Sequence, residues 1–351
     1  MQKHRKLNNI LLIATLIVLI GFFSCSDNNG CGYTSDPDII PIGCTLQSEL
    51  NLATGVDLNE NLITPGLGVV DPYWKLLNNP PLIQCDGSLE AATINGSAYA
   101  INFGGFAQDQ WVNQIGATTL APVDIGTNGS FGCNNATNAE GKIVPYVFER
   151  SFCVLNDTQV NFNFNGKGDD QIYFELINND TNSIISTSGI YIYAFGNLPV
   201  NWVGSNVALN AGSYSIRAYL ANTSSVVLGF SMLGNLTTSN GDQSISNNNE
   251  GCCENNTISV LNVIDSNCNN AFDSLDQLGN NWIFKILNSS NVVVRTGTTD
   301  ANGNIFFSGI PNGTYTVQIV TQTGFTSTIT SVSVTLSNNT VKIANFFNCP
   351  N

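Results

Sequence analysis

The sequence predicts an all-β protein with two antiparallel β-sandwich domains. Short segments alternate apolar and polar residues, as in TQVNFNFNG (158–166), where Val160, Phe162 and Phe164 share one face. Gly and Asn separate these segments, and no amphipathic helical pattern stands out. A period of two between turn residues is typical of strands in a sandwich. The polar stretch LTTSNGDQSISNNNEGCCENN (236–256) is predicted to be a linker between the two domains.

The chain begins with the three parts of an export signal. A basic start, MQKHRK, precedes an apolar run at 10–23 and a small residue before Cys25. The run is too short for a comfortable membrane span. GFFSC resembles the lipobox of bacterial lipoproteins, in which the Cys carries lipid; an ordinary secretory signal is the alternative. We therefore expect a signal peptide at 1–24, a tether at 25–43 and an exported protein held on the bacterial membrane, at the cell surface.

The composition excludes several functional classes. The net charge of −14 disfavours binding to nucleic acid, which requires cationic contacts with phosphates. The sole histidine, His4, lies inside the signal. The exported chain therefore lacks Ser-His-Asp and Cys-His catalysis and every His metal site. No catalytic residue is assigned and no enzyme is expected; a glycosidase that uses two carboxylates is the less favoured alternative.

The chain has ten cysteines, and an exported protein can keep disulfides. Their spacing gives no zinc pattern, because there is no Cys-x-x-Cys and two of them are adjacent. Disulfides are favoured, with one thiol left over beside a lipidated Cys25. The pairs Cys268–Cys349 and Cys133–Cys153 are suggested, although a sequence alone does not determine connectivity.

The first domain, 44–235, contains aromatic and acidic groups that suit a sugar ligand. Sugars stack on aromatic rings, while carboxylates bind their hydroxyls. The segments VDPYWKL (70–76), QDQWV (108–112), YVFERSFCV (146–154) and GKGDDQIYFEL (166–176) together resemble galactose-binding-like jelly-roll carbohydrate-binding modules. The candidate ligand-binding residues are Tyr73, Trp74, Asp109, Trp111, Asp169, Asp170 and Trp202.

Each of these residues also has a purely structural interpretation. Tryptophan in a sandwich is more often part of the core than a binding platform. GKGDD is more often a tight turn with solvated acids than a site. Glu149 and Arg150, adjacent on one predicted strand, are expected to form a surface pair.

The second domain, 257–351, carries seven further strand patterns. TTDANGNIFFSGIPNGTYTVQIV (298–320) contains two turns, and Gly303 is suited to a positive φ in the first of them. This segment and the acidic loop before it resemble the B-type repeat domains of bacterial surface adhesins, the SdrD B-like and collagen-adhesin B-like family. The resemblance implies a prealbumin-like sandwich.

An acidic loop in VIDSNCNNAFDSLDQLG (263–279) has the spacing of a twelve-residue calcium loop. Asn270 replaces the usual Gly but tolerates the left-handed region, and the last ligand is Asp instead of Glu. The alternative is a polar turn that binds no ion. If bound, Ca²⁺ has a structural role. The predicted ligands are Asp265, Asn267, Asn269, the Ala271 carbonyl, Asp273 and Asp276.

The predicted function is that of a lipid-anchored cell-surface protein for adhesion or ligand binding. Its partners would be the membrane, through the lipid, and a glycan or a surface protein. The second domain would serve as a calcium-braced spacer. A purely structural surface lipoprotein is the alternative. Exposure of the tryptophans distinguishes the two hypotheses.

Overall fold

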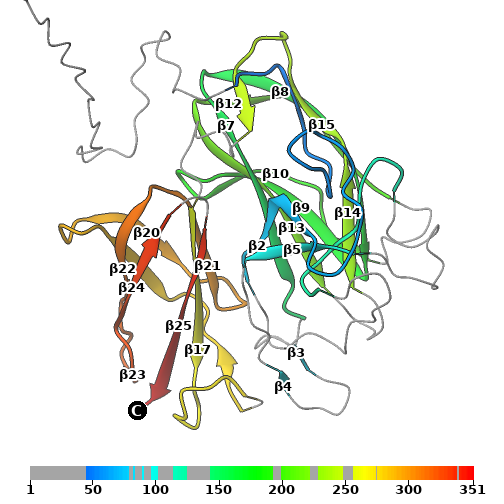
Figure 1. Cartoon of the computed structure of the whole chain (residues 1–351). Helices are drawn as coiled ribbons and strands as arrows, with labels where there is room; N and C mark the ends of the chain where they lie inside the picture. Colours follow the sequence, from blue (N-terminus) through cyan, green and yellow to red (C-terminus); the bar gives the residue numbers. More distant parts are fainter. Residues whose placement is uncertain are drawn as a thin grey trace, which may run out of the picture. The chain divides into compact units, whose positions relative to one another are not determined.

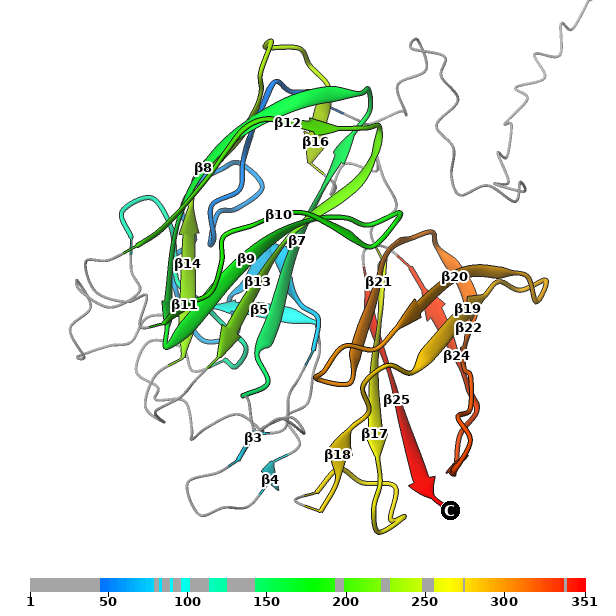
Figure 2. The same ribbon diagram turned by 180° about the vertical axis from the view of Figure 1, so that it is seen from behind.

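Strands make up the regular structure in the part of the chain that the structure describes (Figures 1 and 2). The computed structural model describes residues 45–78, 82–83, 89–90, 96–101, 114–124, 143–192, 199–221, 228–247, 256–273, 275–337 and 340–351. No helix occurs among them, and so none that is long and apolar enough to cross a membrane. The predicted all-β fold class is confirmed. The expected signal, tether and Cys25 lie outside the described residues.

The first sandwich is built from one 14-stranded sheet with the main order β1-β15-β8-β14-β6-β5-β2-β7-β13-β9-β10. β11, β12 and β16 pair with β9, β8 and β7, respectively. β3 (Leu82–Ile83) and β4 (Leu89–Glu90) form a separate pair. The strands of the large sheet are β1 (Glu49–Asn51), β2 (Val70–Leu76), β5 (Ser97–Ala100), β6 (Leu120–Ala121), β7 (Tyr146–Val154), β8 (Thr158–Asp169), β9 (Gln171–Asn178), β10 (Ser183–Thr187), β11 (Tyr191–Ile192), β12 (Val200–Leu209), β13 (Gly212–Ala221), β14 (Gly229–Leu233), β15 (Asn235–Thr238) and β16 (Ile245–Asn247).

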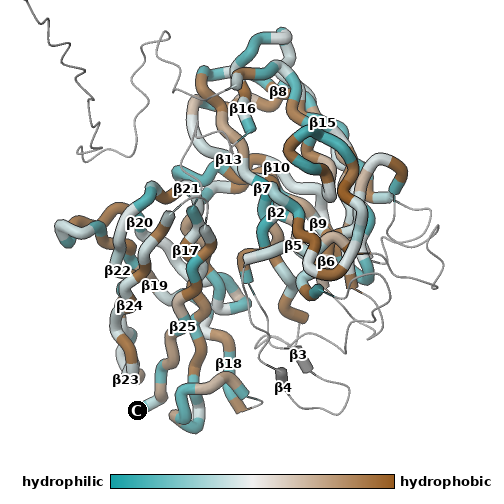
Figure 3. Tube along the Cα trace, in the orientation of Figure 1, coloured by the Kyte–Doolittle hydropathy of each residue, from teal (hydrophilic) through white to brown (hydrophobic). Residues whose placement is uncertain are grey.

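The core lies between two layers of this sheet. Apolar and polar stretches alternate along several of its strands (Figure 3), so those strands bury one face and expose the other. Phe174 of β9 stacks on Trp202 of β12, with 6.3 Å between ring centroids. Trp74 of β2 meets Phe230 of β14 edge-on at 5.4 Å. Aromatic contacts therefore join strands that are distant in the sequence.

Part of the predicted linker belongs to the first sandwich. β15 pairs with β1 and β8, and β16 pairs with β7. Leu236 and Ile245 are fully buried, and each anchors one of these short strands. The stretch was predicted to be a linker because most of its residues are polar, and its composition does not show that two apolar side chains fix it to the sandwich. Residues 248–255, which include Cys252 and Cys253, lie outside the described residues.

The second sandwich packs two sheets around a separate apolar core. One sheet has the order β18-β17-β25-β23, with β21 on β17; the other has the order β20-β19-β22-β24. β17 and β25 run parallel, and the other paired strands are antiparallel. The strands are β17 (Asn256–Ile264), β18 (Gln277–Leu278), β19 (Ile283–Leu287), β20 (Val293–Thr298), β21 (Asn304–Ile310), β22 (Gly313–Ile319), β23 (Phe325–Ser327), β24 (Ser331–Leu336) and β25 (Val341–Pro350).

Two local predictions for the second sandwich are confirmed. Gly303 has φ +70°, and a Cβ there would lie 2.5 Å from the Asn262 carbonyl oxygen, so the turn requires glycine. A disulfide joins Cys268 to Cys349, with 5.4 Å between their Cα atoms. Cys153 is also disulfide-bonded, but Cys133 lies outside the described residues, and that pairing stays a prediction.

Candidate functional site

Four charged residues lie in one row across adjacent strands of the first sandwich. Lys75 on β2 is the cross-strand partner of Glu149 on β7. Glu149 faces Arg217 on β13, and Arg217 in turn faces Glu175 on β9. The signs therefore alternate along the row. Directly opposed strand residues interact, and opposite charges there are favourable.

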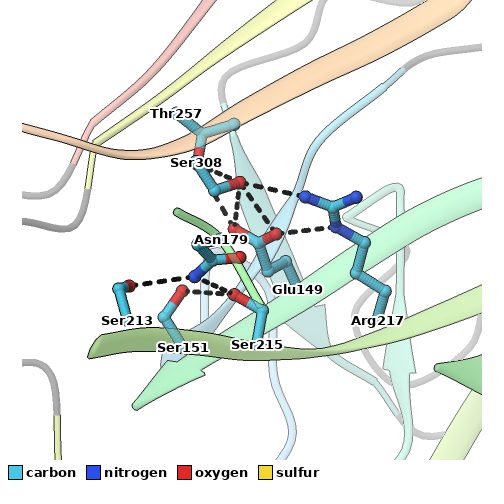
Figure 4. Close-up of polar contacts among 8 residues, drawn as sticks. All are labelled: Glu149, Ser151, Asn179, Ser213, Ser215, Arg217, Thr257 and Ser308. Atoms are coloured by element: carbon cyan, nitrogen blue, oxygen red, sulfur yellow. Dashed lines mark hydrogen bonds and ion pairs between the residues drawn. The ribbon is translucent and has the colours of Figure 1, made fainter. Parts of the chain in front are cut away.

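The second sandwich supplies hydroxyl groups to the centre of this row (Figure 4). Arg217 Nε donates to Glu149 Oε2 at 2.8 Å. Ser308 Oγ of β21 donates to the same carboxylate and lies 2.9 Å from Oε2. Thr257 Oγ1 of β17 lies 3.3 Å from Oε1. Arg217 Nη2 also donates to Ser308 Oγ, at 3.2 Å. The ion pair between Glu149 and Arg217 lies in the first sandwich, and the second sandwich supplies further hydrogen-bond donors to its carboxylate.

A second polar group extends the same face (Figure 4). Asn179 Nδ2 donates to Ser213 Oγ at 3.0 Å and to Ser215 Oγ at 2.9 Å. Ser215 shares a further hydrogen bond with Ser151 at 3.0 Å. Gly309 of the second sandwich has φ +67°, and a Cβ there would lie 3.4 Å from the Asn179 Cβ. The backbone of β21 therefore approaches this group closely.

Apolar residues from both sandwiches surround the ion pair. Leu77 and Val147 of the first sandwich pack with Phe306 of β21, and Tyr219 and Val341 lie against them. The Arg217 guanidinium lies 5.3 Å from the centre of the Phe306 ring. Such a setting excludes water and strengthens the attraction between charges. We call the charged row, its hydroxyls and these apolar residues the junction.

Burial changes how the junction residues titrate. Burial lowers the pKa of Arg217, but the charge of Glu149 and hydrogen bonds outweigh it, so the pKa of Arg217 is raised overall. Burial raises the pKa of Glu175, opposed by a hydrogen bond with Tyr219. Burial lowers the pKa of Lys75 to about 7, opposed by the charge of Glu149. The Lys75 Nζ is buried without a hydrogen bond among the described residues.

The predicted surface pair is wrong, because Glu149 and Arg150 are both buried and point to opposite faces of β7. Arg150 donates to the Ala53 carbonyl at 3.1 Å and lies 4.2 Å above the Tyr73 ring. The Asp71 carboxylate is buried as well and accepts from the backbone N–H groups of Tyr73 and Trp74. Arg150 thus belongs to the interior of the sandwich.

The predicted sugar platform is not present at the tryptophans that the structure describes. Trp74 is 1% exposed and Trp202 is 4% exposed, so neither ring is open to a ligand. Tyr73 is covered by Arg150, and Asp169 and Asp170 are also buried. The aromatic rings fill the core because they carry the largest apolar area. Asp109 and Trp111 lie outside the described residues.

The acidic loop after β17 is folded by its own carboxylates. Asp265 is fully buried, and its oxygens accept from the N–H groups of Asn269 at 3.1 Å and Asn270 at 2.7 Å. Asn270 has φ +60°, the left-handed conformation expected for it. Asp273 Oδ2 accepts from Asn267 Nδ2 at 2.7 Å and from Asn269 Nδ2 at 2.9 Å. These three side chains therefore converge.

The donor set of this loop suits a hard cation, which prefers oxygen ligands. Asp276 accepts from the N–H groups of Ser266 and Asp273, both at 2.9 Å. An ionised carboxylate offers about four acceptor positions. Each Asp276 oxygen accepts only one N–H, so each keeps a position that could bind a metal. Across the described ranges, no three His, Cys, Asp or Glu side chains gather closely enough to hold a metal. Any ion here would therefore also need the oxygens of Asn267 and Asn269.

The comparisons with known proteins identify the second sandwich. Residues 275–348 match the family model of the SpaA prealbumin-like fold domain. The C-terminal sandwich is a prealbumin-like domain. This agrees with the family resemblance of its turn and strand motifs. No curated protein matches the chain.

Solved structures similar to this chain include pilus proteins. The group B streptococcus pilus 2b backbone protein has 11% identity and a TM-score of 0.22, covering 64% of this chain and 98% of its own. The major pilin subunit BcpA of Bacillus cereus has 11% identity and a TM-score of 0.23, covering 86% and 99%. A β-glucuronidase from Ruminococcus gnavus has 10% identity and a TM-score of 0.22, covering 86% and 44%. At these scores, the assignment of the C-terminal domain rests on the family model.

The junction was missed at the level of sequence, although a signal for it existed. YVFERSFCV and SYSIRAYLA place apolar residues on both faces of their strands, with Val147 and Tyr219 on the face away from the core. A strand of a two-layer sandwich normally exposes one face to solvent. Apolar residues on both faces therefore indicate a strand that a further layer covers.

Replacing Arg217 with Met should lower the free energy of unfolding by about 3–5 kcal/mol, because it leaves the Glu149 carboxylate buried without its cation. The double variant Glu149→Leu/Arg217→Met should lose less free energy of unfolding than the sum of the losses in the two single variants. Urea unfolding of all four proteins measures this coupling. The control is Arg295→Met, which breaks a partly exposed 3.9 Å pair with Asp180 and should cost about 1 kcal/mol or less. Equal costs for the two Arg variants would contradict a stabilising junction.

The stability of the protein should rise with pH between about 7 and 9.5. The pKa of Lys75 is about 7 in the folded state, against 10.5 as its ordinary value. In this window the unfolded chain binds the proton and the folded chain does not, so raising the pH favours folding, by up to about 1.4 kcal/mol per pH unit. Urea midpoints at pH 7.5 and 9.5 measure the slope. Lys75→Met should reduce the change of the urea midpoint with pH. An unchanged slope in this variant would show that another group is responsible.

Proposed function

We propose that this is an exported, lipid-anchored cell-surface protein that presents two β-sandwiches as one rigid unit, in a structural or adhesive role. The junction is the observation that carries the proposal. A buried carboxylate is tolerated only where its partners are fixed in place. Glu149 takes those partners from both sandwiches, so any hinge motion that moves Ser308 and Thr257 away would leave it with fewer donors.

Three further observations support an extracellular position. The disulfide between Cys268 and Cys349 is typical of oxidising compartments. The N-terminal pattern is that of an export signal with a Cys where cleavage is expected. The prealbumin-like domain has the resemblance to surface adhesins already noted. The proposed role is one of display and support, and it requires no catalytic residue.

The anchor is tested by replacing Cys25 with Ser in the bacterial host. The unaltered chain should partition into the detergent phase of a Triton X-114 extract and be cleaved by protease added to whole cells. The Cys25→Ser variant should move to the aqueous phase, because it has no thiol to acylate. Ser26→Ala, a neutral change next to Cys25 that keeps its thiol, serves as the control. If the unaltered chain remained in the aqueous phase, the lipid anchor would be refuted.

We also propose that Ca²⁺ braces the acidic loop of the second sandwich. Asp265, Asn267, Asn269, Asp273, Asp276 and the Ala271 carbonyl would hold the ion. Bound Ca²⁺ would supply positive charge to these oxygen donors. The loop begins where β17 ends and carries Cys268, so bracing it would steady both the strand and the disulfide.

Calcium at 10 mM should raise the free energy of unfolding by about 1.4–2.7 kcal/mol, given extracellular affinities of about 10⁻⁴–10⁻³ M. Thermal and urea unfolding of the whole chain, in CaCl₂ and in MgCl₂ at equal ionic strength, measure the gain. Asp273→Asn should abolish the calcium-specific part, and Asp57→Asn, which alters an exposed carboxylate of the first sandwich, should keep it. Identical curves in both salts would refute calcium binding.

A further inference from the structure

The first sandwich has a shallow groove in which amide and hydroxyl groups lie beside apolar surface. It has a volume of about 550 Å³, is largely open to solvent and lies over the strands β12, β8 and β15. Its polar lining comprises Asn161 and Asn163 from β8, Ser205 and Asn206 from β12, and Asn235 and Thr237 from β15. Phe162 of β8 also borders the groove, but its side chain and that of Phe164 are buried in the core beneath, because side chains alternate along the strand.

The groove is shaped by an irregularity in β12. The register between β12 and β8 shifts between Gly204 and Val207. Within the shift, Asn206 has φ +51°, and its N–H donates to Asn161 Oδ1 at 2.8 Å. Bulges of this kind bend a strand and redirect its side chains. Ser205 and Asn206 are thereby placed along one side of the groove.

Hydrogen bonds fix the orientation of the two central amides. Asn163 Oδ1 accepts from Asn201 Nδ2 at 3.0 Å, and Asn161 Oδ1 accepts from the backbone. The Oδ1 of each amide thus accepts a hydrogen bond, while the Nδ2 of Asn161 and of Asn163 makes none within the described part of the chain. Asn235 Nδ2 is directed to Glu49. The groove therefore presents two oriented donors from β8 opposite the Oδ1 acceptor of Asn235.

The chemistry of this surface favours a neutral, hydroxyl-rich ligand. None of the groove-lining residues is charged, and the chain as a whole carries −14, so acidic polymers are repelled. Hydroxyl groups both donate and accept, as the amides and hydroxyls of the groove do. Val203, 60% exposed, offers an apolar contact for C–H groups of a sugar ring. A peptide would add to a free strand edge, but β8 is paired on both sides here.

We propose that the groove over β12, β8 and β15 binds a segment of a neutral polysaccharide, with Asn161 and Asn163 donating to its hydroxyls. The proposal rests on the adhesive form of the proposed function. It places the sugar site on the outer face of the sheet, away from the buried tryptophans. Binding through side chains of a rigid sheet requires no rearrangement of the core.

The test is retention of the whole chain on immobilised neutral polysaccharides, namely a β-glucan, an α-mannan and a galactan, beside the acidic polygalacturonate. Asn163→Asp keeps the acceptor for Asn201 but removes the donor to the groove. At least one neutral polymer should bind saturably, and Asn163→Asp should weaken that binding about tenfold, the cost of one hydrogen bond. Gln318→Glu, the same charge change at an exposed position of β22 in the other sandwich, should leave it unchanged.

Each outcome decides for or against the groove. Absence of retention on every neutral polymer overturns the proposal, as does retention that Asn163→Asp leaves intact. If the chain were retained on immobilised surface proteins but on none of the polysaccharides, the proposal would be wrong and the partner would be a protein. Circular dichroism melting of Asn163→Asp separates loss of the site from loss of the fold. None of these results depends on the lipid anchor, whose failure would appear only in the Triton X-114 partition.

Discussion

The rest of the structure depends on how the Glu149 carboxylate is kept buried. A carboxylate that is removed from water requires a cation and hydrogen-bond donors at fixed distances. Arg217 supplies the charge from a neighbouring strand, while Ser308 and Thr257 supply hydroxyls from the second sandwich. This constraint ties the register of β7 and β13 to the positions of β17 and β21. The two domains therefore share one buried carboxylate, beside the apolar contacts of the junction.

The junction also explains the unusual burial of the central strands. β7 and β13 are buried along nearly their whole length, with core residues on one face and the junction on the other. β8 and β12 instead keep one polar, accessible face, and the amide groove lies there. The two layers of the first sandwich therefore differ in what their outer faces meet. One of its layers contacts the prealbumin-like domain, and the other carries the amide groove.

Much of the fold could be predicted from sequence, because strand periodicity and turn residues act locally. The strands of the second sandwich and the turn at Gly303 followed from such patterns, whereas the Cys268–Cys349 pair was only a suggestion, because local sequence does not determine which cysteines pair. The site residues could not be found in this way. Whether Trp74 lies in the core or on the surface depends on pairing between distant strands, and Glu149 meets Ser308 across a separation of 159 residues. Local sequence indicates at most that both faces of β7 and β13 are covered, and it does not say which distant residues cover them.

The disulfide determines how the second sandwich responds to a tensile force. It connects Cys268, just beyond β17, to Cys349, near the end of β25, over a sequence separation of 81 residues. A tensile force that enters at Asn256 and leaves after Cys349 therefore follows β17, the short loop and the covalent sulfur bridge. The intervening strands β18–β24 carry none of that load along their backbone. Under tension this domain can lengthen by only the few residues outside the bridge, so it behaves as a nearly inextensible link.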